Sequence, residues 1–301
     1  MKQKKSVAIL FLLPFAVCFF LFWLAPFLYG VYMSLCKFSL TKGNRGFIGL
    51  ENYAKIFSSD SMYYESFFRG LKQTLIFVAG SVPFLVLVAL ILALVVEALP
   101  RAVKGFYRTV YFMSYAISVT AVSAIFKWLF DGNGGYINAV LLGTGLISSQ
   151  IQWLETQPYA WISLILATVW WTVGYNMILF INALNSIDTD IYEAADVDGA
   201  GYFQKLFRIT LPNIRAVTGY VLLTSIIASF NMYGQSALIT RSGPRNTTST
   251  LIAEINATIF NNNNLGVGTA MALLMGIVVM VIAMLQRKIQ RADQMGPEVI
   301  G

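Results

Sequence analysis

The chain has 301 residues, of which 57% are hydrophobic and only 12% are charged, about half the charged fraction of an ordinary soluble domain. The net charge is +7 and there is no histidine. Without histidine or a Cys-x-x-Cys motif, the sequence argues against a transition-metal site. In so apolar a chain, the positive charge indicates membrane orientation and not a nucleic-acid partner.

Six runs without a charged residue are each long enough for a membrane helix, which needs about 20 apolar residues. They are apolar all round instead of alternating, so helices fit better than the strands of a barrel. The first run exceeds a signal-peptide core and lacks an A-x-A-like cleavage site. We therefore expect six transmembrane helices, at roughly 7–32, 74–96, 109–130, 159–184, 216–239 and 268–285.

Loop charges predict the orientation of these helices. The short loop 99–108 carries three basic residues and no acid, whereas segment 132–159 holds Glu155 and no base. The positive-inside rule places the first loop in the cytoplasm. Segment 37–72 is then outside although it is basic, which the rule tolerates in longer loops. Basic residues near both ends place both termini inside: Lys2, Lys4, Lys5, Arg287, Lys288 and Arg291.

The polar loop between the fourth and fifth expected helices shows strong local signals. Asp188, Thr189 and Asp190 are N-cap candidates for a short helix that begins before Glu193. Gly199 and Gly201 should end it, and a second short helix should stop before Pro212, which disfavours helical geometry at Leu211. We expect a helix–turn–helix on the cytoplasmic face.

The composition of this loop points to a protein partner. An ordinary solvated connector is the simpler alternative. Such a connector does not need Phe203 and Phe207 interleaved with Lys205 and Arg208, a mixture of aromatic and charged side chains that is typical of protein interfaces.

Three motifs in the loop, Glu193-Ala194-Ala195, Asp198-Gly199-Ala200 and Ile209-x-Leu211-Pro212, resemble the EAA loop of permease subunits in binding-protein-dependent ABC importers. The outer motif Phe47-Ile48-Gly49-Leu50-Glu51-Asn52-Tyr53 is similar to the sugar-permease branch, which includes the larger membrane subunit of the maltose transporter. The resemblance implies an all-α polytopic fold with six transmembrane helices, a type I (MetI-like) core and a coupling helix between helices four and five.

The same resemblance implies the domain organisation. We expect an N-terminal transmembrane helix at 1–36 and an extracytoplasmic segment at 37–70. A permease core should follow at 71–288, with the EAA loop at 188–212, and a cytoplasmic tail at 289–301.

In such importers the EAA loop sits in a cleft of an ATP-binding subunit. The resemblance assigns ATPase coupling to eleven residues: Glu193, Ala194, Ala195, Asp198, Gly199, Ala200, Phe203, Phe207, Ile209, Leu211 and Pro212. The chain has no Gly-x-x-x-x-Gly-Lys-Ser/Thr motif, so we expect ATP and Mg in a separate ATPase, no cofactor here and no enzymatic activity. The implied partners are a dimer of ATP-binding subunits, a second homologous permease and an extracellular or periplasmic solute-binding protein, in a bacterial or archaeal cell membrane.

A polar solute that crosses the membrane needs hydroxyl, amide and aromatic groups along its path, and helices three to five supply them. Alignment with the sugar-contacting positions of the maltose subunit carries over Tyr115, Tyr175 and Ser225. Four further aligned positions hold a different residue type from that subunit: Thr168, Trp171, Thr172 and Ser229. Ala228 and Val119 also depart from the pattern. Trp170 and Trp171 suit either an interfacial belt or the lining of the path.

Other functions compete with a carbohydrate importer. An ABC importer of polyamine, phosphate or amino acid remains open. An ion-coupled secondary transporter normally places ionisable residues within its spans, and none lies mid-span here. A membrane-embedded enzyme needs a nucleophile, an acid–base pair or metal ligands at one depth, and the apolar spans argue against it.

Overall fold

The computed structural model describes residues 5–294, with side chains from residue 11 to residue 290. The side chains of Lys2, Lys4, Lys5 and Arg291, used above for orientation, lie outside these residues, as does the end of the expected tail. The chain forms two compact units. One holds the described residues up to Phe68 together with Glu254–Val278, and the other holds Arg69–Ala253 with the described residues from Val279 onward.

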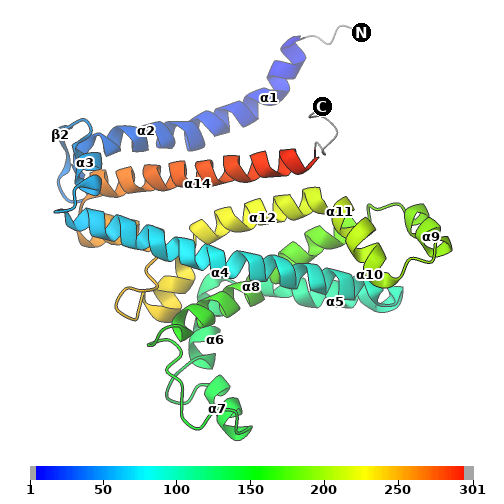
Figure 1. Cartoon of the computed structure of the whole chain (residues 1–301). Coiled ribbons are helices and arrows are strands. Elements are labelled where there is room, and N and C mark those ends of the chain that lie inside the picture. The colour runs from blue at the N-terminus through cyan, green and yellow to red at the C-terminus, as the bar shows by residue number, and fades with distance from the viewer. Residues whose placement is uncertain (1–4, 295–301) are drawn as a thin grey trace. The chain divides into compact units, whose positions relative to one another are not determined.

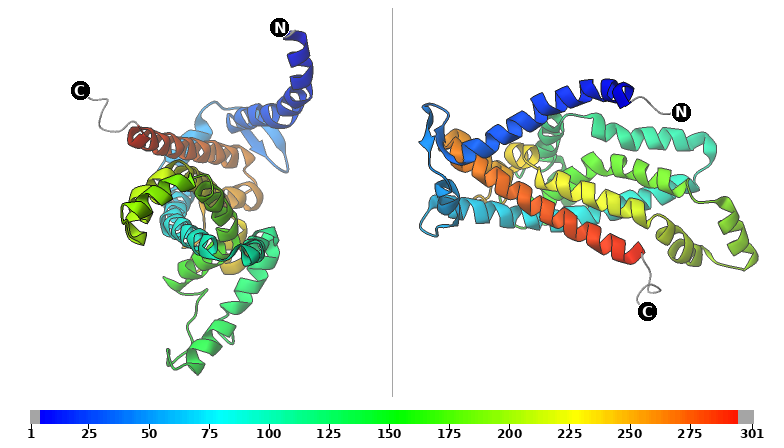
Figure 2. Two further views of the ribbon diagram at one scale, coloured as in Figure 1. Left: turned by 90° about the vertical axis from the view of Figure 1, so that its right-hand side faces the viewer. Right: turned by 90° about the horizontal axis from the view of Figure 1, so that it is seen from above.

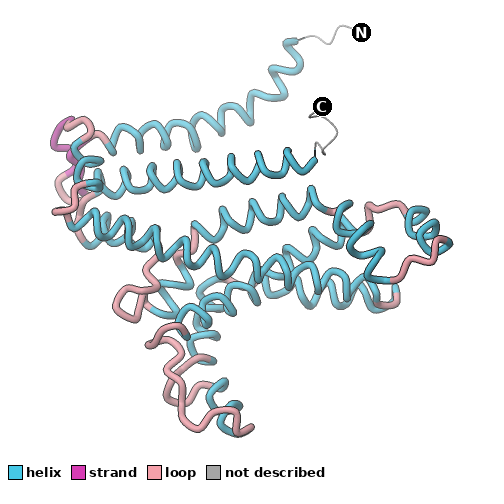
Figure 3. Tube along the Cα trace, viewed as in Figure 1, coloured by secondary structure: helices cyan, strands magenta, loops and turns pink. Residues whose placement is uncertain are grey.

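Helices dominate both units, as the composition predicts. In the described residues the only strands form one two-stranded hairpin (magenta in Figure 3). Among the described residues, four helices are long and apolar enough to cross a membrane, or up to six if each of two bent helix pairs counts as one span. The four are Phe11–Ser34, Met62–Ala98, Tyr159–Leu184 and Leu265–Gln290.

The first unit opens with α1 (Lys5–Phe19), a π-helical turn η1 (Phe20–Leu24) and α2 (Ala25–Ser34), blue in Figure 1. No residue in the most apolar window of this stretch is buried, which suits a helix surrounded by lipid. The hairpin β1 (Cys36–Ser39) and β2 (Gly43–Phe47) follows, antiparallel with Cys36 opposite Phe47. Then come α3 (Glu51–Phe57) and the start of α4 (Met62–Ala98).

The last part of the first unit packs closely at Gly266. After α13 (Leu251–Asn256) and η5 (Ala257–Asn261), α14 (Leu265–Gln294) begins beside the hairpin. The Asn52 amide donates to the carbonyls of Ser34 at 2.8 Å and Cys36 at 2.9 Å. A Cβ on Gly266 would lie 2.5 Å from the Cys36 carbonyl oxygen. Glycine is therefore needed for α14 to start this close to β1.

The second unit is built around α4, α8 (Tyr159–Leu184) and α12 (Arg215–Phe230). Ala89, Met177 and Val221, one from each helix, are fully buried in a shared core. At the other side of α8, α5 (Arg101–Met113) packs against Gly174, where a Cβ would meet the Tyr111 carbonyl oxygen at 2.0 Å. This glycine sets the separation of α5 and α8.

A charge cluster fixes the turn between α4 and α5. The Lys104 ammonium donates to Glu97 at 2.9 Å, and Arg108 pairs with the other oxygen of the same carboxylate. Both bases lie on α5, just after the Pro100 turn. The predicted short basic connection therefore folds back on the end of α4.

The third expected helix is not continuous. α5 ends in a 3-10 turn, η2 (Ser114–Ala116). The next helix, α6 (Val119–Leu129), is bent by 95° from the helix Arg101–Ala116 that α5 and η2 form. Ile117 is extended, and the Ser118 side chain caps α6 by accepting from the Ala121 N–H at 3.3 Å. The Trp171 indole donates to the Ile117 carbonyl at 2.9 Å. These side chains satisfy the backbone that the break exposes.

The fifth expected helix is also shorter than 216–239. α12 ends at Phe230, and a π-helical segment η4 (Ser236–Thr240) follows an irregular stretch. The fourth expected helix matches α8, and the sixth lies within α14, which starts three residues earlier at Leu265. Between α6 and α8, α7 (Tyr136–Gly143) projects from the unit (Figure 1).

Candidate functional site

A central cavity of about 450 Å³ lies inside the second unit, a size typical of small-molecule sites. Its walls come from α4, the break between α5 and α6, α8, and α12 with the irregular stretch after it. All seven predicted substrate-binding residues line it: Tyr115, Thr168, Trp171, Thr172, Tyr175, Ser225 and Ser229. Val119 and Ala228, two positions that depart from the maltose subunit, line it as well.

One wall of the cavity is aromatic. The Tyr115 and Tyr175 rings stack with centroids 5.1 Å apart and an interplanar angle of 22°, and Trp171 lies 6.5 Å from Tyr115. The Trp171 hydrogen bond to Ile117 holds this wall in place. Trp170 does not line the cavity, and its ring lies 5.4 Å from the Phe126 ring at an interplanar angle of 59°. The structure thus separates two tryptophans that the sequence could not distinguish.

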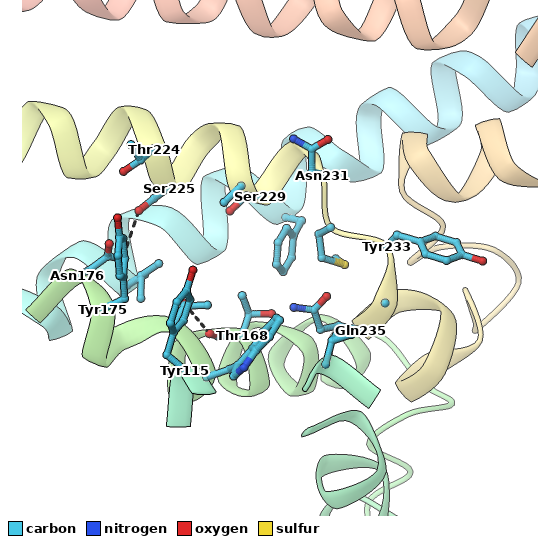
Figure 4. Close-up of a pocket in the computed structure, with 18 residues that line it drawn as sticks. Tyr115, Thr168, Tyr175, Asn176, Thr224, Ser225, Ser229, Asn231, Tyr233 and Gln235 are labelled. Carbon is cyan, nitrogen blue, oxygen red and sulfur yellow. Dashed lines mark hydrogen bonds between the residues drawn. The ribbon is translucent and has the colours of Figure 1, made fainter. Parts of the chain in front are cut away.

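The rest of the lining includes polar, uncharged groups from α8 and α12. The Asn176 amide donates to Ser225 Oγ at 3.3 Å, and Ser229 is 6% exposed on the same helix as Ser225 (Figure 4). The buried Thr168 hydroxyl has no hydrogen-bond partner in the protein. No Asp, Glu, Lys or Arg is among the described residues that line the cavity. A buried hydroxyl without a partner costs free energy unless a ligand or water satisfies it.

Sequence reasoning missed several polar groups of this cavity. Asn176, Thr224, Asn231, Tyr233 and Gln235 also line it, and Figure 4 shows the Gln235 amide reaching into the cavity. Asn176 directly follows the predicted Tyr175 in the sequence. The signal that could have identified Asn176 is an amide side chain within an otherwise apolar span. The last three lie at or beyond the end of α12, where a continuous helix was expected. The end of α12 places the irregular backbone and its amide side chains along the wall of the cavity. Irregular backbone is tolerated in a membrane protein where it lines a cavity.

The helix–turn–helix loop is formed by α9 (Thr189–Val197), α10 (Tyr202–Lys205), η3 (Leu206–Thr210) and α11 (Leu211–Asn213), at one end of the second unit (Figures 1 and 2). The Asp188 carboxylate caps α9 by accepting from the Asp190 N–H at 3.1 Å. At the other end Gly199 is left-handed, with φ +74°. Its N–H bonds to Asp196 at 3.1 Å, and the Ala200 N–H bonds to Ala195 at 2.9 Å. These are the paired bonds of a Schellman helix end.

Side chains tie the two halves of this loop together. The Tyr192 hydroxyl on α9 lies 2.8 Å from the Thr210 hydroxyl on η3. Lys205 on α10 pairs with Asp196 on α9. The resemblance identified Gly199, which ends α9, but not the four residues of these cross-links, Tyr192, Asp196, Lys205 and Thr210.

The expected end before Pro212 is wrong. Helical structure continues through Leu211 and Pro212 to Asn213, and the 64° bend comes at Ile214. A π-helical turn precedes Pro212, which then falls in the first turn of α11, where a missing N–H costs little.

The loop presents an apolar surface outward. Phe203 is 70% exposed and Phe207 63%, and their neighbours Val197 and Tyr202 are also exposed. The structure places the other predicted coupling residues along the same loop. Glu193, Ala194, Asp198 and Pro212 are exposed, Ala200, Ile209 and Leu211 are partly buried, and Ala195 is buried. Among described residues, no group of three His, Cys, Asp or Glu side chains is placed to hold a metal.

The family model described as "Binding-protein-dependent transport system inner membrane component" matches residues 54–292. The chain is 30% identical over 287 residues to the probable ABC transporter permease protein YurN of Bacillus subtilis, covering 95% of this chain and 96% of that protein. It is 28% identical to the arabinooligosaccharides transport system permease protein AraP of the same organism, covering 95% and 89%.

A solved structure shows the same fold. The bacterial alginate ABC transporter, in complex with alginate pentasaccharide-bound periplasmic protein, contains a chain that superposes with a TM-score of 0.81. The match is 22% identical and covers 96% of this chain and 95% of that one.

Proposed function

The chain belongs to the binding-protein-dependent transport system inner membrane components, and we propose that it forms half of the translocation path of an ATP-driven importer for a neutral sugar or oligosaccharide. The observation that carries the cargo assignment is the central cavity, which has an aromatic wall together with hydroxyl and amide groups and no charged lining residue. Sugars present hydroxyls at their edges and C–H surfaces on their faces, and this cavity has groups for both.

Charge argues against the competing cargoes. Polyamines, phosphate and amino acids all carry formal charges at neutral pH. Moving a charge into a water-poor cavity without a counter-charge costs several kcal/mol. The cavity offers no carboxylate or cation among its described lining residues, and the same lack argues against a proton- or ion-coupled transporter. The name of the relative AraP, which concerns arabinooligosaccharides, points to carbohydrate as well.

The loop 188–212 would dock on the ATPase. The exposed Phe203 and Phe207 offer aromatic anchors of the kind that dominate protein interfaces. Two contacts join the halves of the loop, so that they would move together: the hydrogen bond between Tyr192 and Thr210 and the ion pair between Asp196 and Lys205. Because α12 follows α11 directly, movement of the docked loop can pass to the wall that holds Ser225 and Ser229.

The membrane arrangement completes the proposal. Four long helices, the broken pair α5–α6 and α12 would make six spans, with both termini and the loop 188–212 in the cytoplasm. A second, related permease would complete the path, an ATPase dimer would bind ATP and Mg, and a solute-binding protein would deliver the cargo.

The test is cargo-dependent transport by the reconstituted complex. The solute-binding protein encoded beside this chain is first screened by thermal shift against neutral oligosaccharides, uronate oligosaccharides, amino acids and phosphate. The complex in proteoliposomes is then assayed for uptake of whatever stabilises it. Uptake of a neutral saccharide supports the proposal. Stabilisation by amino acids or phosphate alone would exclude the carbohydrate assignment.

A further inference from the structure

A second recess, of about 250 Å³, lies in the first unit between the β1–β2 hairpin and the turn after η5. Its lining includes three cationic side chains, Lys37, Lys42 and Arg45. Three consecutive asparagines, 262–264, also line it. The recess thus combines positive charge with hydrogen-bond donors, which is the chemistry that binds carboxylates.

The two sides of the recess are fixed to each other. The Thr41 N–H donates to Asn263 Oδ1 at 3.2 Å, and the Asn263 amide donates to the Thr41 hydroxyl at 2.6 Å. The Asn264 amide donates to the Tyr63 hydroxyl at 2.9 Å. These bonds join segments more than 200 positions apart in sequence, so the backbone of the hairpin turn is fixed beside the asparagine turn.

The positive charge of the recess is not neutralised within the unit. No ion pair among the described side chains involves Lys37, Lys42 or Arg45. Glu51 on α3 is bonded to Lys55 at 2.7 Å. The Lys55 ammonium holds the pKa of Glu51 below its usual range, and Lys37 adds a smaller lowering. From residue 37 to residue 47 the sequence has no acidic residue.

The surroundings of the recess resemble a protein interface. Phe47 and Leu50 are 68% and 70% exposed, and Leu40 at the hairpin turn is 47% exposed. Protein interfaces are enriched in aromatic residues and arginine, and Arg45 and Phe47 lie on the same strand β2. The hairpin also belongs to the basic segment 37–72, which lies outside the cell in the orientation expected from the loop charges.

We propose that this recess binds carboxylate side chains on an acidic surface of the solute-binding protein. The inference rests on the proposed function, because it needs such a protein on the outer side. The planar guanidinium of Arg45 and the asparagine amides suit the planar carboxylate group. A carboxylate would also relieve the repulsion among the three cations, which opposes their gathering in one place.

The experiment uses the whole complex in nanodiscs of phosphatidylcholine, titrated with sugar-loaded solute-binding protein. The test variant is Lys42→Gln/Arg45→Gln. The control, Lys72→Gln, removes a positive charge from the same segment outside the recess and leaves the ion pair between Glu51 and Lys55 intact. We expect the test variant to raise the Kd about tenfold at low salt, mainly through slower association, and the control to change it less than about twofold. The difference should shrink at high salt because screening weakens exposed charges.

Each outcome decides a distinct point. An unchanged Kd in the test variant would overturn the inference. Loss of affinity in the test variant only when the discs contain phosphatidylglycerol would also overturn it, since the ligand would then be a lipid headgroup. If the unmodified complex bound no solute-binding protein, the proposed function itself would fail. Basal ATPase activity should stay unchanged in both variants, which would show that they assemble. If the double variant does not assemble, the Kd is measured for Lys42→Gln alone.

Discussion

Gly199→Val should uncouple transport from ATP hydrolysis while leaving the membrane helices intact. Gly199 has φ +74°, a left-handed conformation that costs an L-residue about 1–2 kcal/mol and a β-branched residue more. A Cβ there meets nothing within 4 Å, so the cost is conformational and not steric. At about 2 kcal/mol, the ratio of correctly folded to misfolded loop falls roughly 30-fold. The two bonds that end α9 depend on this residue.

The assay is uptake into proteoliposomes, with ATPase stimulation by the solute-binding protein measured in parallel. The amount of inserted chain, measured by immunoblot, should not change. The matched control is Gly201→Val. Gly201 has φ −71° and ψ 167°, an extended conformation that valine favours, and its Cβ also meets nothing. Gly199→Asn should retain most activity because asparagine tolerates the left-handed region. Normal uptake by Gly199→Val, or equal loss in Gly201→Val, would refute the reasoning.

Three further substitutions test separate parts of the structure. Gly174→Ala should sharply lower the yield of folded complex, because its Cβ would meet the Tyr111 carbonyl at 2.0 Å; Gly276→Ala, in open space on α14, should not lower it. Tyr175→Ala should raise the transport KM about tenfold, from loss of an aromatic face worth about 1–2 kcal/mol, and an unchanged KM would remove this ring from the path. Phe203→Ser should weaken ATPase binding about tenfold or more without lowering the melting temperature, since the side chain is 70% exposed.

The breaks in two expected helices explain how an apolar bundle contains a polar cavity. A continuous helix through Ile117 or Asn231 would use its backbone groups internally. Instead Trp171 and Ser118 satisfy the first break, and the second delivers Asn231 and Gln235 to the cavity. Both breaks lie against the same space, as expected where irregular backbone is tolerated at membrane depth.

The sequence by itself determined the features that depend on local or averaged chemistry. Long charge-free runs are a property of the chain alone, and α8 spans the predicted 159–184. The ends of α9 were predictable because both signals are local. Asp188 caps the start of the helix, and Gly199 makes the left-handed turn just after its end. The resemblance identified seven residues that the fold brings to one cavity.

Only the tertiary structure decided where helices break and which side chains meet. The run 216–240 has no charged residue, and the polar residues after Phe230 do not by themselves show that α12 stops there. The different surroundings of Trp170 and Trp171 depend on Phe126 and Ile117, more than 40 positions away. The backbone contact at Gly174 and the gathering of Lys37, Lys42 and Arg45 with three asparagines likewise join distant segments. A contact between distant segments depends on how they pack, which local propensity and hydropathy do not encode.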